Sequence, residues 1–286
     1  MGALNELSLK LYRAVMILPR AHSLQRVRER MFGPKNGRYS VDLNPPLPHP
    51  IDRQYGIDTS GHLGFNALRS GKSSDIYMTS YGGSQPSILR RTLRAIPDLD
   101  RSVFLDLGCG KGRATVVATE FPFRRIIGVE LAPSVVPFAR ANAERIGWQF
   151  PERTPIEVIE GDALATAIPD GQVVIFFYHP FFRALMKKIV AKMENALKGK
   201  EERRIFVAYY DPVYGDLYDK SRYFQRFFAG NIDFEPFELG TGASCFDCQD
   251  TVVIWQSRGG DMAPPHPGAE AKLRVIPPGW RAEVMS

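Results

Sequence analysis

Cysteine is scarce in this sequence, and its scarcity excludes a disulfide-stabilised secreted domain. Among 286 residues there are three cysteines, Cys109, Cys245 and Cys248. Three thiols cannot all pair, which is typical of a protein in a reducing compartment. Cys245 and Cys248 form a CxxC, but a structural zinc site needs four ligands and the sequence offers no second pair. We therefore expect incidental thiols and no metal.

Long hydrophobic runs are also missing. No stretch of about 18 uncharged apolar residues occurs, which argues against a membrane span. Lys10 and Arg13 interrupt the apolar beginning of the chain, and no small-residue cleavage site follows it. We expect a cytoplasmic protein.

A surplus of one charge sign is confined to the first forty residues. The chain has 37 Lys and Arg against 31 Asp and Glu, a net charge of +6. The first forty residues hold eight of the basic and two of the acidic side chains, so the remainder has 29 of each sign. This balance excludes a histone-like chain. The neutral remainder of the protein gives no electrostatic reason to expect a nucleic-acid partner. Any electrostatic docking would use the N-terminal segment.

Three regions are expected along the chain. Residues 1–60 combine apolar positions at helical spacing, from Leu4 to Leu18, with a proline-rich connection over 35–60 that we predict to be extended. Residues 61–257 form the main domain, and 258–286, rich in Pro and Gly, form a surface tail. The helical arm could serve as a lid, as a contact in a homodimer or as a docking surface.

Strand-like and helix-like segments alternate in the main domain. The buried-strand patterns are 103–107, 125–130, 156–160, 173–178 and 205–210. The helical patterns between and before them are 87–96, 113–120, 134–146 and 182–197. This alternation predicts an α/β fold with a doubly wound, mostly parallel sheet. Two further strand-like runs, 234–239 and 251–256, lack a helix between them and predict an antiparallel closing pair.

A glycine-rich turn follows the first predicted strand. Asp106, Gly108, Gly110 and Gly112 form a DxGxGxG run that opens a helix, a place where a ligand can approach the backbone closely. The dinucleotide fingerprint GxGxxG would need a further glycine where Arg113 stands, which disfavours a pyrophosphate ligand.

With this run the chain resembles the class I S-adenosylmethionine-dependent methyltransferases, and the resemblance extends over residues 80–256 in element order. It implies a seven-stranded Rossmann-like sheet and S-adenosylmethionine as cofactor. In that family, residues matching Asp106, Gly108 and Gly110 hold the methionine amino group and line the cofactor. A carboxylate matching Glu130, followed here by Leu131, accepts bonds from both ribose hydroxyls.

Two further segments match cofactor-binding positions of the family. Asp162 and Ala163, after the third strand, correspond to the adenine side, with Asp162 accepting the exocyclic amine. Upstream of the first strand, Tyr81 and Ser84 lie where related enzymes contact the methionine carboxylate. A purely structural loop is the alternative for this upstream segment.

The reaction centre is expected after the fourth strand, at Tyr178, His179, Pro180 and Phe181. This run resembles the [Asn/Asp]-Pro-Pro-[Tyr/Phe] motif of nitrogen methyltransferases, and a Tyr-Asn-Pro-Phe pattern found in a bacterial group. His179 fits a general base, or alternatively a helix cap. Tyr178 is expected to face the sulfonium or the acceptor, and Tyr210, at the end of the fifth strand, is a third candidate catalytic residue.

These features predict a methyltransferase of the EC 2.1.1 type that acts on nitrogen or oxygen of a small, aromatic or apolar acceptor. The first alternative is a protein-lysine or RNA methyltransferase that docks through the basic arm. The second is an inactive regulatory subunit that binds the cofactor, since fold and binding do not establish turnover.

Overall fold

The computed structural model describes residues 48–61, 63, 68, 81–178, 181–238, 249–260, 262–273 and 275, and all statements below concern these residues. The N-terminal helical arm, His179 and the pair Cys245 and Cys248 lie outside the described residues. The predictions made for them therefore stay predictions.

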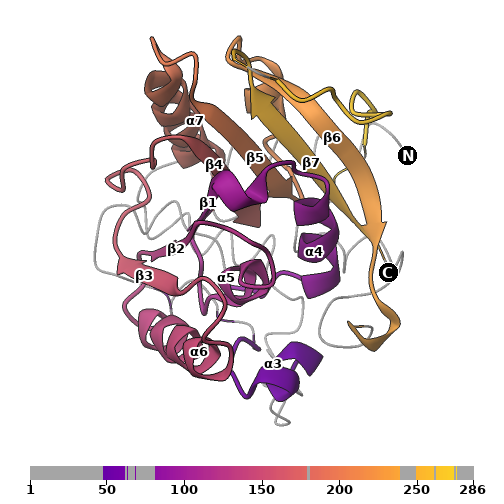
Figure 1. Ribbon diagram of the computed structural model, residues 1–286. Helices are drawn as coiled ribbons and strands as arrows, with labels where there is room; N and C mark the ends of the chain where they lie inside the picture. Colours follow the sequence, from indigo (N-terminus) through magenta and orange to yellow (C-terminus); the bar gives the residue numbers. More distant parts are fainter. Residues whose placement is uncertain are drawn as a thin grey trace, which may run out of the picture. The chain divides into compact units, whose positions relative to one another are not determined.

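A seven-stranded sheet organises the described chain (Figure 1). Its strands are β1 Ser102–Leu107, β2 Arg125–Glu130, β3 Ile156–Glu160, β4 Gln172–Tyr178, β5 Arg204–Tyr210, β6 Phe224–Asp233 and β7 Gln249–Ser257. Their order is β3-β2-β1-β4-β5-β7-β6. The first five strands run parallel, and β7 pairs antiparallel with both β5 and β6. The predicted Rossmann-like methyltransferase fold class is confirmed.

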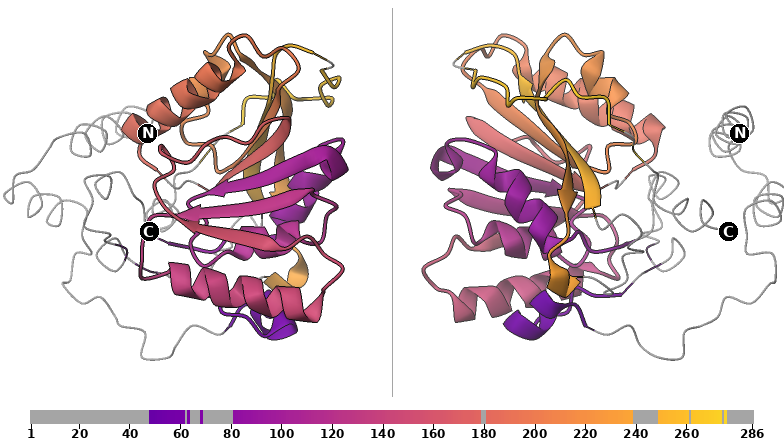
Figure 2. Two further views of the ribbon diagram at one scale, coloured as in Figure 1. Left: turned by 60° about the vertical axis from the view of Figure 1, so that its left-hand side comes forward. Right: turned by 90° about the vertical axis from the view of Figure 1, so that its right-hand side faces the viewer.

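Helices cover both faces of the sheet. They are α3 Pro50–Tyr55, α4 Pro86–Arg94, α5 Arg113–Ala118, α6 Val136–Gln149, α7 Arg183–Leu197 and α8 Asp216–Asp219, with short 3-10 helices η3 Leu99–Arg101 and η4 Pro236–Glu238. Figure 2 shows α4 and α7 on opposite sides of the strands. No helix among the described residues is long and apolar enough to cross a membrane.

The two faces of the sheet carry separate apolar clusters. Phe104 of β1 packs with residues of α4 and α5, whereas its neighbour Leu105 packs with residues of α7 and α8. All six residues of β1 are buried. This explains why the parallel strands read as continuous apolar runs rather than as alternating patterns.

The strand order reverses beside β1, since β2 pairs with one edge of β1 and β4 with the other. Crossovers leave such a point in opposite directions, which opens a crevice at the carboxyl ends of the strands. The residues that follow β1, β2, β3 and β4 therefore meet at one edge of the sheet.

The predicted strand over 234–239 is wrong. The antiparallel partner of β7 is β6, which begins at Phe224, and Pro236–Glu238 form a 3-10 helix. A register irregularity between Arg226 and Phe228 breaks the period-two alternation, so β6 lacked a strand signal. Pro236 has no backbone N–H to offer a neighbouring strand.

The prediction of an extended connection over 35–60 is wrong for residues 50–55, which form α3. Pro50 occupies the first turn, where its missing N–H costs nothing, and Gly56 ends the helix with φ 63°. Tyr55 packs edge-on against Phe150 at a ring-centroid distance of 5.4 Å, and its hydroxyl lies 3.1 Å from Glu120 Oε1. This part of the chain is therefore packed against the residues that directly follow α5 and α6.

Candidate active site

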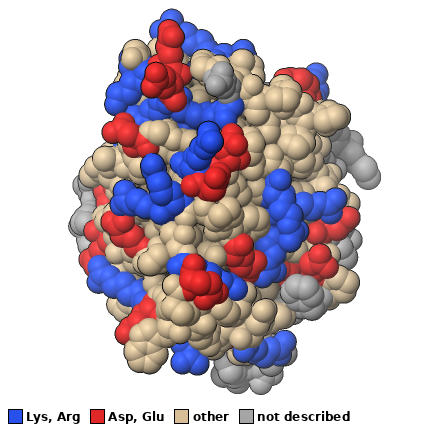
Figure 3. Space-filling view, in the orientation of Figure 1, with Lys and Arg blue, Asp and Glu red and all other residues tan. Residues whose placement is uncertain are grey.

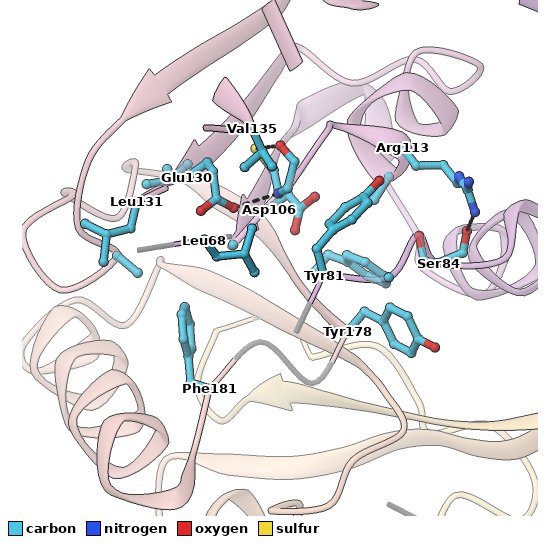
Figure 4. A pocket seen from close by; sticks show the side chains of 18 of the residues that line it. Leu68, Tyr81, Ser84, Asp106, Arg113, Glu130, Leu131, Val135, Tyr178 and Phe181 are labelled. Carbon is cyan, nitrogen blue, oxygen red and sulfur yellow. Dashed lines mark hydrogen bonds between the residues drawn. The ribbon is translucent and has the colours of Figure 1, made fainter. Parts of the chain in front are cut away.

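A cleft opens at the carboxyl ends of β1 to β4 and encloses about 890 Å³ of space, part of it open to solvent (Figure 4). All ten residues that the sequence predicts to bind the cofactor line it. They are Tyr81, Ser84, Asp106, Gly108, Gly110, Glu130, Leu131, Asp162, Ala163 and Tyr178. Residues from five separate segments thus converge on one cavity, although their roles toward a ligand stay predictions.

Asp106, the next-to-last residue of β1, has a buried carboxylate. Its exposed fraction is 4%, and no donor within the described chain is hydrogen-bonded to it. Burial, reinforced by the negative charge of Glu130, raises the pKa of Asp106 well above its usual value. Among the described residues no group compensates the ionised form, for which a cation in the cleft would be a suitable partner.

Glu130, the last residue of β2, fixes the glycine-rich turn. Its Oε2 accepts the Gly110 N–H at 2.8 Å, and its Oε1 accepts the Ala132 N–H at 2.8 Å. Burial raises the pKa of Glu130, and these backbone bonds oppose the rise. Each carboxylate oxygen has a second lone pair, so Glu130 can hold the turn and still accept from a ligand.

The glycine turn leaves no room for a side chain at Gly110. This residue has φ +54°, and a Cβ there would lie 2.3 Å from Cε2 of Tyr81. The Tyr81 ring thus packs directly on the turn, while its hydroxyl donates to the Thr59 carbonyl at 2.7 Å. Tyr81 contributes its ring to the wall of the cleft, and its hydroxyl is already bound.

The loop after β3 forms the other end of the cleft. Asp162 Oδ1 accepts the Leu164 N–H at 2.7 Å, which caps the turn. Lys192 of α7 donates to the carbonyls of Ala163 and Leu164 at 2.9 and 2.7 Å, and also to that of Thr166. Burial lowers the pKa of Lys192. These bonds hold the loop against α7.

The two predicted catalytic tyrosines lie side by side but have different surroundings. Tyr178 lines the cleft and stacks on Tyr210 with a centroid distance of 4.2 Å and an interplanar angle of 26°. Tyr210 is 1% exposed and its hydroxyl donates to Asp250 Oδ2. Burial raises the pKa of Tyr210 well above its usual value. Tyr210 supports Tyr178 from behind and does not line the cleft.

The structure adds lining residues that the sequence did not single out for this site. These are chiefly Leu68, Gly83, Arg113, Val135 and Leu185. Figure 4 shows Leu131 and Phe181 toward one end of the cleft and Tyr81, Ser84 and Arg113 toward the other. The sequence drew attention to Arg113 only because it stands where a dinucleotide-binding site needs glycine. That observation disfavoured a pyrophosphate ligand but did not place Arg113 in the cleft.

Comparison with known proteins shows what this region is similar to. Residues 104–200 match the family described as "Methyltransferase domain". Over 79 residues the chain is 34% identical to a trans-aconitate 2-methyltransferase of Methylobacterium radiotolerans. This match covers 25% of the chain and 30% of that relative, so it spans less than a third of the relative's length.

Solved structures with a similar course of the chain are more distant in sequence. A precorrin-6y C5,15-methyltransferase from Geobacter metallireducens is 16% identical, with 63% of this chain and 94% of that chain covered and a TM-score of 0.43. A magnesium protoporphyrin IX methyltransferase from Synechocystis, solved with bound S-adenosylmethionine, is 11% identical, with 60% and 77% covered and a TM-score of 0.42.

The matched segment begins in β1, which carries Asp106, and continues through α7. It therefore includes the glycine turn, Glu130 and the loop at Asp162, which form the greater part of the described cleft. Residues 104–200 are thus similar to methyltransferase domains, and the residues of this segment that line the cleft are those expected of the class I, S-adenosylmethionine-dependent kind.

Proposed function

We propose that the protein transfers a methyl group from S-adenosylmethionine to a nitrogen or oxygen atom of a small acceptor. The observation that carries this proposal is the buried carboxylate of Asp106 in the cleft, near the carboxylate of Glu130 and without a hydrogen-bond donor among the described residues. An ammonium group is the partner that Asp106 lacks, and paired hydroxyls suit the free lone pairs of Glu130. The residues present thus fit this cofactor.

The cofactor supplies, when bound, an electrophilic methyl group on a sulfonium. The chain's own residues hold and orient it: Asp106 binds the amino group, Glu130 the ribose and Asp162 the adenine amine. Leu131 and Phe181 provide apolar contact at the adenine end. Fixing both reactants in one cleft supplies much of the rate of such a displacement.

The Tyr178 ring forms the wall between cofactor and acceptor in this proposal. Its stacking on Tyr210 fixes its orientation, and an aromatic face next to a sulfonium is electrostatically favourable. His179 follows it directly in the sequence and is the proposed base that accepts the proton of an alcohol, phenol or ammonium acceptor. A base of near-neutral pKa suits that step.

The three carboxylates of the cleft are assigned to the cofactor, so its aromatic lining is what favours an acceptor with an apolar part. Its described lining contains the carboxylates of Asp106, Glu130 and Asp162 and a single cationic side chain, Arg113. The rest of the lining includes the aromatic rings of Phe176, Tyr178 and Phe181. An acceptor with several carboxylates, as trans-aconitate has, would find little positive charge among these residues.

The alternative is methylation of protein lysine or RNA, with the basic N-terminal arm as docking surface. Figure 3 shows Lys and Arg side chains interspersed with Asp and Glu on the face drawn there, rather than gathered in a stripe. A polyanion partner would therefore depend on the arm. The small acceptor is accordingly our first choice.

Methyl transfer by the full chain distinguishes these activities. Labelled S-adenosylmethionine would be incubated with separate pools of small amines and phenols, of RNA and of protein, with the Asp106→Ala variant as control. We expect label in small molecules. This activity should persist when residues 1–40 are deleted, and it should depend on salt concentration no more than the activity of the full chain does. Label in RNA or protein that is lost on this deletion, with steep salt dependence, would establish the alternative instead.

A further inference from the structure

The connection from β3 to β4 differs from the other parallel crossovers of the sheet. Helices α5, α6 and α7 fill those crossovers, whereas residues 161–171, all of them described, form a loop without a helix (Figure 1). This loop begins in the cleft, because Gly161, Asp162 and Ala163 line it. Hydrogen bonds from side chains must therefore do part of what helix packing does elsewhere.

Lys192 of α7 spends its whole donor capacity on the first half of this loop. Its ammonium donates to the carbonyls of Ala163 and Leu164 at 2.9 and 2.7 Å, and also to that of Thr166. An ammonium group has three N–H donors, so all three are used by this one loop. Burial lowers the pKa of Lys192, and the negative charge of Asp162 opposes this and favours the ammonium form.

The second half of the loop has a separate cation. Arg203 donates to the Ile168 carbonyl at 2.5 Å and to the Pro169 carbonyl. Neither of these two residues is among the described residues that line the cleft. The bonds of Lys192 are thus the ones that bear on the cleft.

Two peptide units connect Lys192 to the carboxylate of Asp162. The Ala163 carbonyl, which accepts from Lys192, shares a planar peptide unit with the Leu164 N–H, which donates to Asp162 Oδ1 at 2.7 Å. The Leu164 carbonyl likewise shares a unit with the Ala165 N–H, which donates to the Asp162 carbonyl at 3.0 Å. Fixing the carbonyl ends of these units fixes the N–H ends that hold Asp162.

This arrangement leaves one oxygen of Asp162 for a ligand. Its Oδ1 is bound to the turn, while no hydrogen bond to its Oδ2 is found within the described chain. Lys192 is not among the described residues that line the cleft. It can therefore act on a ligand only through the turn.

We propose that Lys192 is a positioning residue for the adenine end of the cofactor, because its ammonium orients the turn from which Asp162 accepts the adenine amine. This inference rests on the proposed function, which assigns that amine to Asp162. Without the ammonium, both peptide units lose the donor that orients them. Ordering Asp162 then costs entropy on binding, which offsets part of the bond to the amine.

Calorimetry with two ligands tests the proposal without turnover. The ligands are S-adenosylhomocysteine and S-inosylhomocysteine, which has an oxygen in place of the adenine amine. We expect the wild-type chain to bind S-adenosylhomocysteine at least about tenfold more tightly, because a carboxylate accepts from the amine and repels the oxygen. In Lys192→Met the ratio should fall below about threefold, chiefly through weaker binding of S-adenosylhomocysteine.

Two further variants are the controls. Lys192→Arg keeps a cation with several N–H donors and should retain most of the ratio. Lys187→Met removes the same charge from an exposed position of the same helix and should leave the ratio unchanged. If Lys192→Met does not fold, Lys192→Gln replaces it, and its shorter, uncharged side chain should also narrow the ratio.

The outcomes separate the two levels of the account. If Lys192 only supports the fold, its neutral variants weaken both ligands equally and keep their ratio, which overturns the inference. Equal binding of both ligands to the wild-type chain overturns it as well, and needs no variant to fold. If neither ligand binds the wild-type chain, the proposed function itself fails.

Discussion

Replacing Asp106 with Asn should stabilise the free protein and weaken cofactor binding at once. The carboxylate is 4% exposed and has no hydrogen-bond partner within the described chain. Asn keeps the shape of the side chain but cannot carry the charge that burial and Glu130 disfavour. The same change therefore removes a cost from the unliganded state and removes an ion pair from the liganded one.

The sign of the pH dependence follows from the raised pKa. Asp106 binds its proton more tightly in the folded chain than at its usual value of 3.8. Its contribution to stability is therefore complete below that value and is lost as the pH rises through the folded pKa. At a pH well above 3.8, keeping this buried group in the folded chain costs about 1 kcal/mol or more, so Asp106→Asn should raise Tm by roughly 2–4 °C per kcal/mol relieved.

The cofactor effect has the opposite direction and a larger size. A hydrogen bond to a charged group contributes about 1.5–3 kcal/mol, which is roughly a 10- to 150-fold change in Kd. Thermal unfolding at pH 8, with and without S-adenosylhomocysteine, measures both quantities in one assay. The wild-type chain should gain much more Tm from the ligand than Asp106→Asn does. The reasoning would be refuted if Asp106→Asn had a lower Tm than the wild-type chain without ligand and gained as much Tm as the wild-type chain on adding S-adenosylhomocysteine.

Two further predictions concern Tyr210 and His49. Tyr210→Phe keeps the ring stacked on Tyr178 but loses the bond to Asp250; we expect a several-fold lower kcat with an unchanged S-adenosylhomocysteine Kd, and a changed Kd with normal kcat would contradict the supporting role. Burial, followed by the charge of Arg113, lowers the pKa of His49 to about 4 from 6.5. Unfolding should therefore become easier as the pH falls from about 6.5 toward 4, and His49→Asn should flatten this Tm profile; equal slopes for both proteins would exclude His49 as the cause.

The elements near the site were largely predictable because burial on both faces gives parallel strands a clear signal. The bounds predicted for β2 and β3, 125–130 and 156–160, are those observed. The carboxylates at their ends could be assigned to one edge because parallel strands end together. The convergence of Asp106, Glu130 and Asp162 on one cleft followed from that rule.

The failures have equally local causes. Proline-rich sequence concealed α3, because Pro50 stands where a helix tolerates it. The irregular register of β6 removed its alternation. Tyr210 pairs with Tyr178 across β4 and β5, but sequence patterns do not show which of two neighbouring strand ends is open to a ligand. Arg113 could not be assigned, because the partners that orient it, such as Thr59, are 54 residues distant in the chain.

The central claim is that the cleft at the ends of β1 to β4 binds S-adenosylmethionine. A crystal structure of the full chain with S-adenosylhomocysteine tests it most directly. The account predicts the amino group of the ligand at Asp106, its ribose at Glu130 and its carboxylate beside Ser84. A ligand bound elsewhere, or in this cleft with its amino acid directed toward Asp162, would contradict the assignment of the site.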